Sequence, residues 1–575
     1  MASTKIYLLD LKDRGLAISS IGHIQTKAEA KALITNILQG RNNKTKKKTL
    51  PLSTSSFFST LFSKSQKHLH NAFKVIDPPF HSSVDSCPAF GGNFAPVEEL
   101  EPTDCEVIMG ELPLTFNGVY IRNGPNDAQN QPGHLLDLFF GDGMLHSLQL
   151  SNGHARYCSR YVKTYKYMIE RDAGSPLFPS ASSLYKIVDL LRFLMAILTG
   201  HLDPMKGSGV ANTSLAFFAN KLVALCEYDL PYAINLTENG DIETLGRWEF
   251  DGKPKLLANM TAHPKVDSET KETFAFRWSL IFPHLTFFRF DENGIKQKEV
   301  PIFSIKQPSF FHDFAITKRF AIFHETQLVV SPMKVMMGRG KLVDYQPGKT
   351  PRIGVIPRNS LNDSEMKWFE IQGFNTIHIL NAWENGDDEI VVLAPNIASF
   401  YNAFDENVEI KLEKVTINMK TKNVSRNILS PRNLDFGSIN PCYVGKETRF
   451  TYLGVNTEAS MKMSGVVKID LKMGGEVGRR FYGLGCFGGE PLFVRRNPED
   501  TMSDEDDGYL VSYVHNEQTN ESKFLVMDAQ SPELDIVAMV KLPRRVPYGF
   551  HGLFLAKDQI PNYSIFPVNE LKCNT

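Results

Sequence analysis

From about residue 100 onward, the chain alternates short apolar runs with clusters of turn residues. Three examples are Gly118-Val119-Tyr120-Ile121-Arg122 before Asn123-Gly124-Pro125-Asn126, Leu222-Val223-Ala224-Leu225 before Asp229-Leu230-Pro231, and Glu389-Ile390-Val391-Val392-Leu393 before Ala394-Pro395-Asn396. Strands at this spacing, with few long helical patterns, predict a closed all-β architecture. Seven propeller blades would take about 65 to 70 residues each. Because no exact repeat is visible, the pattern alone does not fix the number of blades.

Two segments have helical spacing instead. The first contains Phe57, Phe58, Leu61, Phe62, Leu69 and Phe73 between lysines. The second covers residues 184–198, with apolar side chains at Leu184, Ile187, Leu190, Leu191, Phe193, Leu194 and Ile197. It is shorter than the ~20 apolar residues that a membrane-spanning helix needs. Either it packs as a buried helix, or it lies in a membrane interface with Lys186 and Arg192 at the level of the headgroups.

Composition narrows the functional classes. The 575 residues are 42% hydrophobic, which is enough for one very large domain. A formal net charge of -1 gives no argument for nucleic acid, and we expect none as a partner. We also expect no obligate protein partner. The 40 phenylalanines indicate a heavy β core or an apolar tunnel. The 7 cysteines are odd in number and form no CxxC, which argues against a disulfide framework or a zinc ribbon.

Residues 1–76 differ from residues 77–575, which we expect to form a single domain. This leader is rich in Lys, Arg, Ser and Thr, and its only acidic residues are Asp10, Asp13 and Glu29. Such a composition is typical of an organelle transit peptide. A disordered basic tail, or a nuclear signal at Lys46-Lys47-Lys48, is the alternative.

Four histidines lie in apolar or small-residue surroundings: His263, His312, His378 and His551. They are 49, 66 and 173 residues apart, which is too far for a zinc finger or an HExxH helix. One such histidine alone is more often a core residue than a ligand. Four neutral imidazoles meeting in one fold would suit iron, copper or zinc, and would leave two positions open on an octahedral ion.

Several motifs together resemble the carotenoid cleavage dioxygenases. They are residues 116–126 and 140–146, Thr261-Ala262-His263-Pro264-Lys265, Phe311-His312-Asp313, His378 with Asn381-Ala382-Trp383-Glu384, Gly489-Glu490-Pro491 and Tyr548-Gly549-Phe550-His551-Gly552. They occur in order over residues 95 to 555. Residues 433–441 resemble the plastid-type carotenoid cleavage dioxygenase 4 branch, which favours a plastid over a mitochondrion as the destination of the leader.

The resemblance implies a seven-bladed propeller with a helical cap over the metal-bearing face. It implies one Fe(II) per chain on the axis, held by the four histidines, with O2 as the co-substrate. Glu227, Asp435 and Glu490 would hold the second ring nitrogens of three ligands. Many relatives have glutamate where this chain has Asp435, so the shorter side chain reaches its histidine either directly or through water.

The implied reaction splits a C=C bond of a carotenoid or apocarotenoid into two carbonyl products. The branch implies a cut at 9,10 and/or 9′,10′, giving a C13 ketone of the β-ionone type and an apocarotenal. A 7,8 cut, or 11,12 cleavage of a 9-cis-epoxycarotenoid, is the alternative. Aromatic candidates for the substrate tunnel, for which core packing is the competing interpretation, are Phe310, Phe311, Phe374, Trp383, Phe487 and Phe550.

Two other classes of propeller protein are alternatives to the dioxygenase. A propeller metal hydrolase or lactonase would favour oxygen ligands over histidine. A non-catalytic binding propeller would have inert core histidines. The resemblance to the carotenoid cleavage dioxygenases implies a plastid location, with the protein on a membrane or plastoglobule surface.

Overall fold

The computed structural model describes residues 6–10, 17–21, 92–128, 135–174, 176–178, 193–194, 196–198, 200–252, 255–331, 343–398, 408–457, 462–498, 500 and 502–560. The chain divides into two compact units, Met1–Asp77 and Pro78–Thr575. In the first unit, β1 (Ile6–Asp10) pairs with β2 (Ala17–Ile21). The amphipathic pattern predicted between Phe57 and Phe73 lies outside the described residues.

Four antiparallel sheets of the described part contain four strands each. The first consists of β7 (Ser214–Phe218), β8 (Lys221–Leu225), β9 (Tyr232–Leu236) and β10 (Ile242–Arg247). The second consists of β11 (Lys265–Val266), β12 (Thr273–Trp278), β13 (Leu285–Phe290) and β14 (Val300–Pro301). The third consists of β15 (Ala315–Ile316), β16 (Phe320–Glu325), β19 (Arg352–Pro357) and β20 (Lys367–Glu370). The fourth consists of β21 (Asn381–Asn385), β22 (Glu389–Ile397), β23 (Ile410–Asn418) and β24 (Val424–Ile428).

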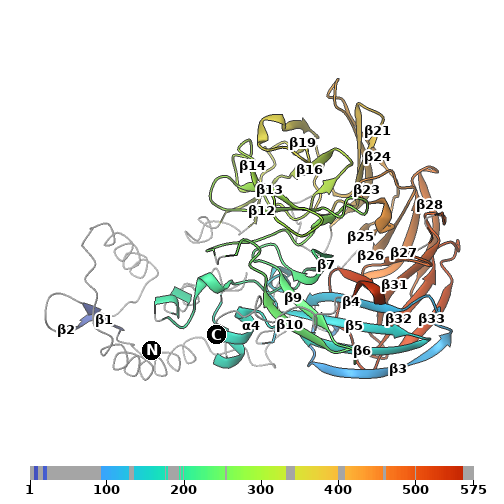
Figure 1. Ribbon diagram of the computed structural model, residues 1–575, viewed down its shortest axis with the longest axis horizontal. Coiled ribbons are helices and arrows are strands. Elements are labelled where there is room, and N and C mark those ends of the chain that lie inside the picture. Colours follow the sequence, from blue (N-terminus) through green and yellow to red (C-terminus); the bar gives the residue numbers. More distant parts are fainter. Residues whose placement is uncertain are drawn as a thin grey trace. The chain divides into compact units, whose positions relative to one another are not determined.

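A further sheet of 14 strands joins both ends of the second unit. Its C-terminal part consists of β25 (Leu434–Ser438), β26 (Phe450–Asn456), β27 (Met463–Asp470), β28 (Gly475–Phe481), β29 (Cys486–Gly488), β30 (Leu492–Arg495), β31 (Gly508–Asn516), β32 (Glu521–Asp528), β33 (Ile536–Lys541) and β34 (Gly552–Ala556). Its N-terminal part consists of β3 (Leu100–Gly110), β4 (Gly118–Pro125), β5 (Gly143–Ser151) and β6 (His154–Tyr161). Figure 1 shows the blue strands β3 to β6 beside the red strands β31 to β33. Because β34 pairs with β4, and β3 pairs with both β33 and β6, the last strands close onto the first.

Helices are few among the described residues. They include α3 (Leu135–Leu138) and α4 (Tyr165–Ala173). A small separate sheet consists of β17 (Leu328–Val330) and β18 (Val343–Tyr345). Thr164 caps the start of α4, and Gly174 ends it with a φ of 59°. The prediction of a mainly β protein is therefore confirmed. No helix in the described part is long and apolar enough to cross a membrane.

Phenylalanines fill the spaces between sheets. Phe274, Phe276, Phe287 and Phe323 form one buried cluster, in which side chains of β12 and β13 meet those of β16 and β19. Alternating apolar positions on a strand give each sheet such a face, and burial of each ring contributes about 1.5–3 kcal/mol. A large part of the unusual phenylalanine content therefore lies in the β core.

The second segment predicted to be amphipathic, residues 184–198, lies only partly within the described residues. Leu184, Ile187, Leu190 and Leu191 lie outside the described residues. Phe193 and Ile197 are half-buried against a cluster that contains Phe178, Ala196 and Leu202. Leu194 is 39% exposed. The described part therefore combines a packed side with an exposed apolar residue.

Candidate metal centre

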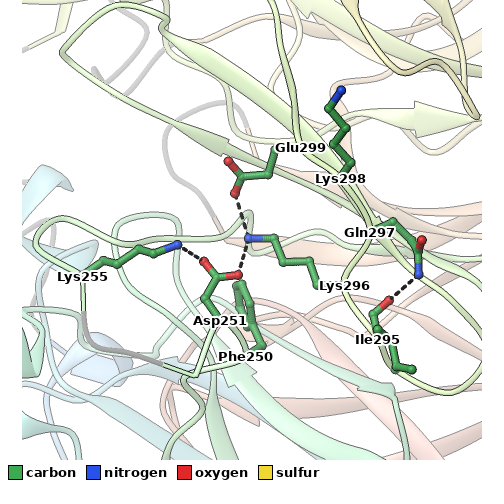
Figure 2. Close-up of a pocket in the computed structure, with 9 residues that line it drawn as sticks. Phe250, Asp251, Lys255, Ile295, Lys296, Gln297, Lys298 and Glu299 are labelled. Atoms are coloured by element: carbon green, nitrogen blue, oxygen red, sulfur yellow. Dashed lines mark hydrogen bonds and ion pairs between the residues drawn. The ribbon is translucent and has the colours of Figure 1, made fainter.

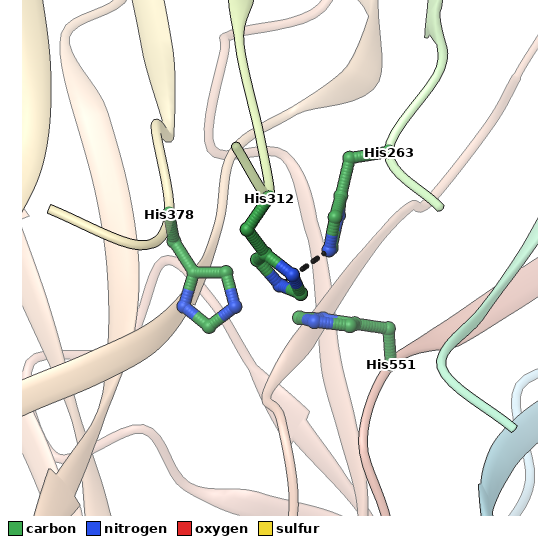
Figure 3. Close-up of side chains that lie close together, drawn as sticks. All are labelled: His263, His312, His378 and His551. Carbon is green, nitrogen blue, oxygen red and sulfur yellow. Dashed lines mark hydrogen bonds between the residues drawn. The ribbon is translucent and has the colours of Figure 1, made fainter. Parts of the chain in front are cut away.

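The four predicted histidines converge, as Figure 3 shows, and their ligand nitrogens all lie within 4.8 Å of one another. Each histidine precedes the edge strand of a different sheet. His263 lies just before β11, His312 before β15, His378 before β21 and His551 before β34. The loop that enters each edge strand therefore delivers one imidazole, and residues far apart in the sequence meet at one point.

Three of these imidazoles have a carboxylate on Nδ1. The pairs are His312 with Glu227, His378 with Asp435 at 2.9 Å, and His551 with Glu490 at 2.9 Å. A carboxylate that accepts the Nδ1–H fixes the tautomer and leaves the Nε2 lone pair for a metal ion. For His263, the contact described is instead between its Nε2 and that of His312, 2.9 Å apart.

Asp435 reaches His378 directly, without a bridging water. The pairing of β25 with β26 shifts register between Asp435 and Ser438, and Phe436 in this bulge has a φ of 50°. Such a bulge bends a strand and redirects its side chains. Asp435 Oδ1 also accepts the amide N–H of Phe436 at 2.8 Å, which fixes the carboxylate.

The surroundings lower the pKa of His263 and favour its neutral imidazole, whereas they raise the pKa of His378 and favour positive charge there. Burial holds the pKa of His263 well below its usual range, and the neighbouring histidines lower it further. Burial would also lower the pKa of His378, but the charge and hydrogen bond of Asp435 outweigh burial and raise it. Burial would raise the pKa of Asp435, and the contact with His378 lowers it instead. The carboxylate therefore stays ionised beside the ring.

This donor set fits a divalent transition metal. Two nitrogens that each lie about 2.1 Å from one ion, at right angles, are about 3.0 Å apart. The 2.9 Å between the Nε2 atoms of His263 and His312 matches that separation. Four imidazole nitrogens suit iron, copper or zinc, whereas calcium and magnesium prefer oxygen. The three carboxylates supply negative charge around the imidazoles and favour a cation between them.

Phe436 is an aromatic neighbour of the histidines that the sequence prediction did not include. Its ring stacks on that of His551 with centroids 5.2 Å apart, and lies 5.2 Å from that of His378. The available signal was its position next to Asp435. Among the predicted tunnel residues, Phe310 lies parallel to His312 at 6.1 Å, and Phe550 stacks on Phe139 at 5.4 Å.

The other predicted tunnel residues have different surroundings. Phe311, Phe374 and Trp383 lie in three separate core clusters between strands. Phe487 is half-buried on β29, with Lys462 Nζ 5.1 Å from the ring centroid. Core packing accounts for the burial of the first three, and a tunnel role for these residues stays a prediction.

A surface pocket of about 550 Å³ contains none of the four histidines. Phe250, Asp251, Lys255 and residues 294–299 line it, at the connection between β13 and β14 (Figure 2). Lys296 Nζ lies 2.8 Å from both Asp251 and Glu299, and Lys255 Nζ lies 2.5 Å from Asp251, so two ammonium groups balance two carboxylates. This pocket therefore offers little to the chemistry of the histidine cluster.

A cluster of four histidines, one buried and three partly buried, with carboxylates on three of the rings, defines a candidate metalloenzyme in a mainly β fold. Comparison with known proteins gives its family. The family described as retinal pigment epithelial membrane protein matches residues 94–556. The chain belongs to this family, the carotenoid oxygenases, and is an enzyme of the dioxygenase type. The resemblance read from the motifs is thereby confirmed.

Individual relatives agree with this. The probable carotenoid cleavage dioxygenase 4, chloroplastic, of Arabidopsis thaliana is 53% identical over 500 residues, which cover 84% of this chain and 83% of that protein. The 9-cis-epoxycarotenoid dioxygenase NCED1, chloroplastic, of Oryza sativa subsp. japonica is 49% identical over 504 residues, or 84% of this chain and 78% of that one. The solved structure of Pseudomonas brassicacearum lignostilbene dioxygenase has a TM-score of 0.72 at 25% identity, over 83% of this chain and 99% of that chain.

Proposed function

We propose that the protein is a non-haem Fe(II) dioxygenase that cleaves one C=C bond of a carotenoid or apocarotenoid into two carbonyl products. One iron per chain would be held by His263, His312, His378 and His551, with O2 as the co-substrate. The convergence of four imidazole nitrogens within 4.8 Å carries this proposal. The names of the two plant relatives support the substrate class, since both are called dioxygenases of carotenoids or epoxycarotenoids.

The side chains around that centre would have separate roles. A ferrous ion bound by neutral imidazoles would supply the activation of O2 toward an electron-rich double bond. Glu227, Asp435 and Glu490 keep the Nδ1–H bonds of their histidines occupied, so that each Nε2 stays aimed inward. Phe436 places an aromatic face beside two ligands, where it can stabilise positive charge that develops on a polyene by about 1 to 2 kcal/mol.

The bond that is cut depends on how the substrate lies. Each carbon of depth in the predicted substrate tunnel would change which double bond faces the centre, because the reacting atoms must be held in contact. We propose the 9,10 and/or 9′,10′ bond, which gives a C13 ketone of the β-ionone type and an apocarotenal. Aerobic incubation with a panel of carotenoids, followed by mass analysis of the fragments, tests this. Products of 7,8 or 11,12 cleavage would move the assignment to those bonds.

Metal analysis of the purified chain separates the chemical classes. We expect close to one iron per chain and incorporation of both atoms of ¹⁸O2 into the products. Zinc, calcium or no metal, together with no cleavage of any carotenoid, would favour a hydrolase or a binding propeller instead. Each of those outcomes would overturn the proposal.

We also propose that the second unit is a single seven-bladed propeller, with helices that cover the metal-bearing face. Four sheets have four strands each, and the sheet of 14 strands contains three further groups of four, namely β25 to β28, β30 to β33, and β34 with β4 to β6. Strands β29 and β3 connect these groups. The four single sheets and the three groups support seven blades.

Residues 1–76 would act as a transit peptide for a plastid. The basic, acid-poor composition of this leader and the chloroplastic names of both plant relatives support this proposal. Fusion of residues 1–76 to a fluorescent protein tests it by microscopy. Fluorescence that stays in the cytosol, or that enters the nucleus, would contradict the plastid assignment.

We propose that the enzyme docks on a membrane or plastoglobule surface. Residues 280–282, here called the apolar tip, support this in addition to Leu194. The tip joins β12 to β13, Ile281 in it is 70% exposed, and the Phe282 ring lies 5.7 Å from that of Phe303. Lys306 Nζ lies 5.5 Å from the Phe282 ring. An ammonium group beside exposed apolar side chains suits an interface between headgroups and acyl chains.

A further inference from the structure

Asp313 directly follows His312, and its carboxylate is almost completely buried, with 4% of the side chain exposed. One oxygen, Oδ1, lies 2.8 Å from Lys265 Nζ and accepts the amide N–H of Phe314 at 2.7 Å. The other oxygen, Oδ2, accepts the amide N–H of Ile379 at 2.8 Å. Three donors therefore satisfy this buried charge.

The three donors belong to three different histidine-bearing segments. Lys265 lies two residues after His263, Phe314 lies in the segment of Asp313 itself, and Ile379 directly follows His378. One carboxylate thus joins the segments that carry three of the four proposed ligands. Thr261 adds a second link, because its hydroxyl accepts from the amide of His263 at 3.1 Å and donates to the carbonyl of His312 at 3.3 Å.

Asp313 acts differently from the carboxylates already described. Glu227, Asp435 and Glu490 each bind one imidazole Nδ1 and so orient a single ring. The amides that Asp435 and Glu490 also accept belong to Phe436, next to Asp435 itself, and to Gly552, next to His551, so neither carboxylate joins two histidine segments. The contacts of Asp313 are instead to a lysine amine and to two backbone amides. Such contacts fix where each loop begins its strand, and hence the distances between ligands.

We infer that Asp313 is a positioning residue for the metal centre, an inference that rests on the proposed function. It holds the loops of His263, His312 and His378 at the separations that a shared ion requires. Charge-assisted hydrogen bonds to a buried carboxylate are short and directional, which makes them suited to this task. A ligand set must be held within about 0.5 Å of its working geometry, so loss of the link should weaken the site even where the protein stays folded.

The test compares one variant at this link with a matched variant elsewhere. Asp313→Asn keeps an oxygen for one amide but loses the charged bond to Lys265. Asp470→Asn is the control, because Asp470 is also a buried carboxylate that one cation and two backbone amides hold. It accepts from Arg449 at 2.8 Å and from two backbone amides at 2.8 and 3.1 Å, at the last residue of β27, a strand that follows none of the four histidines.

The readouts are the rate at which the iron-loaded, full-length protein releases iron to a ferrous chelator, and the ligand-field absorption of the cobalt-loaded form. In Asp313→Asn, we expect release on the order of ten to a hundred times faster than in the wild type, and shifted cobalt bands. Asp470→Asn should lower Tm but leave both readouts unchanged. Wild-type release and an unshifted spectrum in Asp313→Asn would overturn the inference, as would equal changes in the control.

Lys265→Met provides a second variant if Asp313→Asn does not fold. It removes only the link to the His263 segment and leaves the amide bonds of Asp313 with Phe314 and Ile379 intact. We expect faster iron release here as well, and wild-type release would contradict the inference. A wild-type chain without stoichiometric metal would instead contradict the proposed function, so the two failures are distinguishable.

Discussion

Glu490 binds two consecutive residues, since its Oε1 lies 2.9 Å from the imidazole Nδ1 of His551 and its Oε2 accepts the N–H of Gly552 at 2.8 Å. The carboxylate therefore orients the ring and fixes the start of β34 together. Because β34 pairs with β4, the same contact lies at the closure between the C-terminal and N-terminal strands.

Glu490→Gln tests the first of these roles. The amide can bond Gly552 or the imidazole, but it loses the negative charge that makes the ligand more basic, so we expect iron affinity to fall about ten- to a hundredfold. Tm of the iron-free protein should change much less, because the side chain keeps its size and one acceptor. Iron titration and thermal unfolding measure the two effects. Full turnover with unchanged iron affinity would remove the assigned role.

Asp435→Glu should be harmful, although it keeps the negative charge. The bulge at Phe436 already brings the shorter carboxylate to 2.9 Å from His378, so an added methylene must displace either the ring or the strand. We expect about a tenfold loss of iron affinity. Asp435→Asn is the control for loss of charge without change in length. Wild-type affinity in the glutamate variant would show that the bulge adapts.

Sequence motifs were sufficient to predict that these four histidines meet, because each lies in a short and specific fragment. The mainly β fold could also be predicted, since apolar runs and turn residues alternate locally. The pairing of β3 with β33 could not, because it joins residues more than 400 positions apart through backbone atoms that carry no side-chain signal.

Two residues near the metal centre show why the rest was not predictable. Phe436 lies beside His378 and His551 within a bulge where its φ is positive, and local sequence does not reveal a bulge in one strand of a pair. The role inferred for Asp313 depends on where Lys265 and Ile379 lie in space. Conversely, Phe311 directly precedes His312, yet its side chain enters a core cluster, since neighbouring residues of an extended chain point to opposite sides.

Phe311→Ala should therefore affect mainly stability, and Phe436→Leu should affect mainly catalysis. Removal of the Phe311 ring from its core cluster should lower the free energy of unfolding by about 3–5 kcal/mol, with kcat/KM of the folded, iron-loaded enzyme nearly unchanged. Phe436→Leu keeps apolar bulk but loses the aromatic face, so we expect kcat/KM to fall about tenfold with a small change in stability. Denaturant unfolding and initial rates on one carotenoid measure both. A lower kcat/KM in Phe311→Ala would instead support its predicted tunnel role.

Replacement of Leu280, Ile281 and Phe282 by serine should weaken binding to liposomes of plastid lipids. The three side chains are exposed in the described structure, so their removal should cost little stability, whereas each apolar group inserted in lipid contributes roughly 25 cal/mol per Å² of buried surface. Co-sedimentation measures binding, and iron content and Tm show that the fold is retained. Leu361→Ser, at another exposed leucine, controls for a general loss of surface hydrophobicity.

Unchanged sedimentation of the triple variant would exclude the apolar tip as the docking site. The same experiment on Leu194→Ser would then test the partly described segment as the alternative.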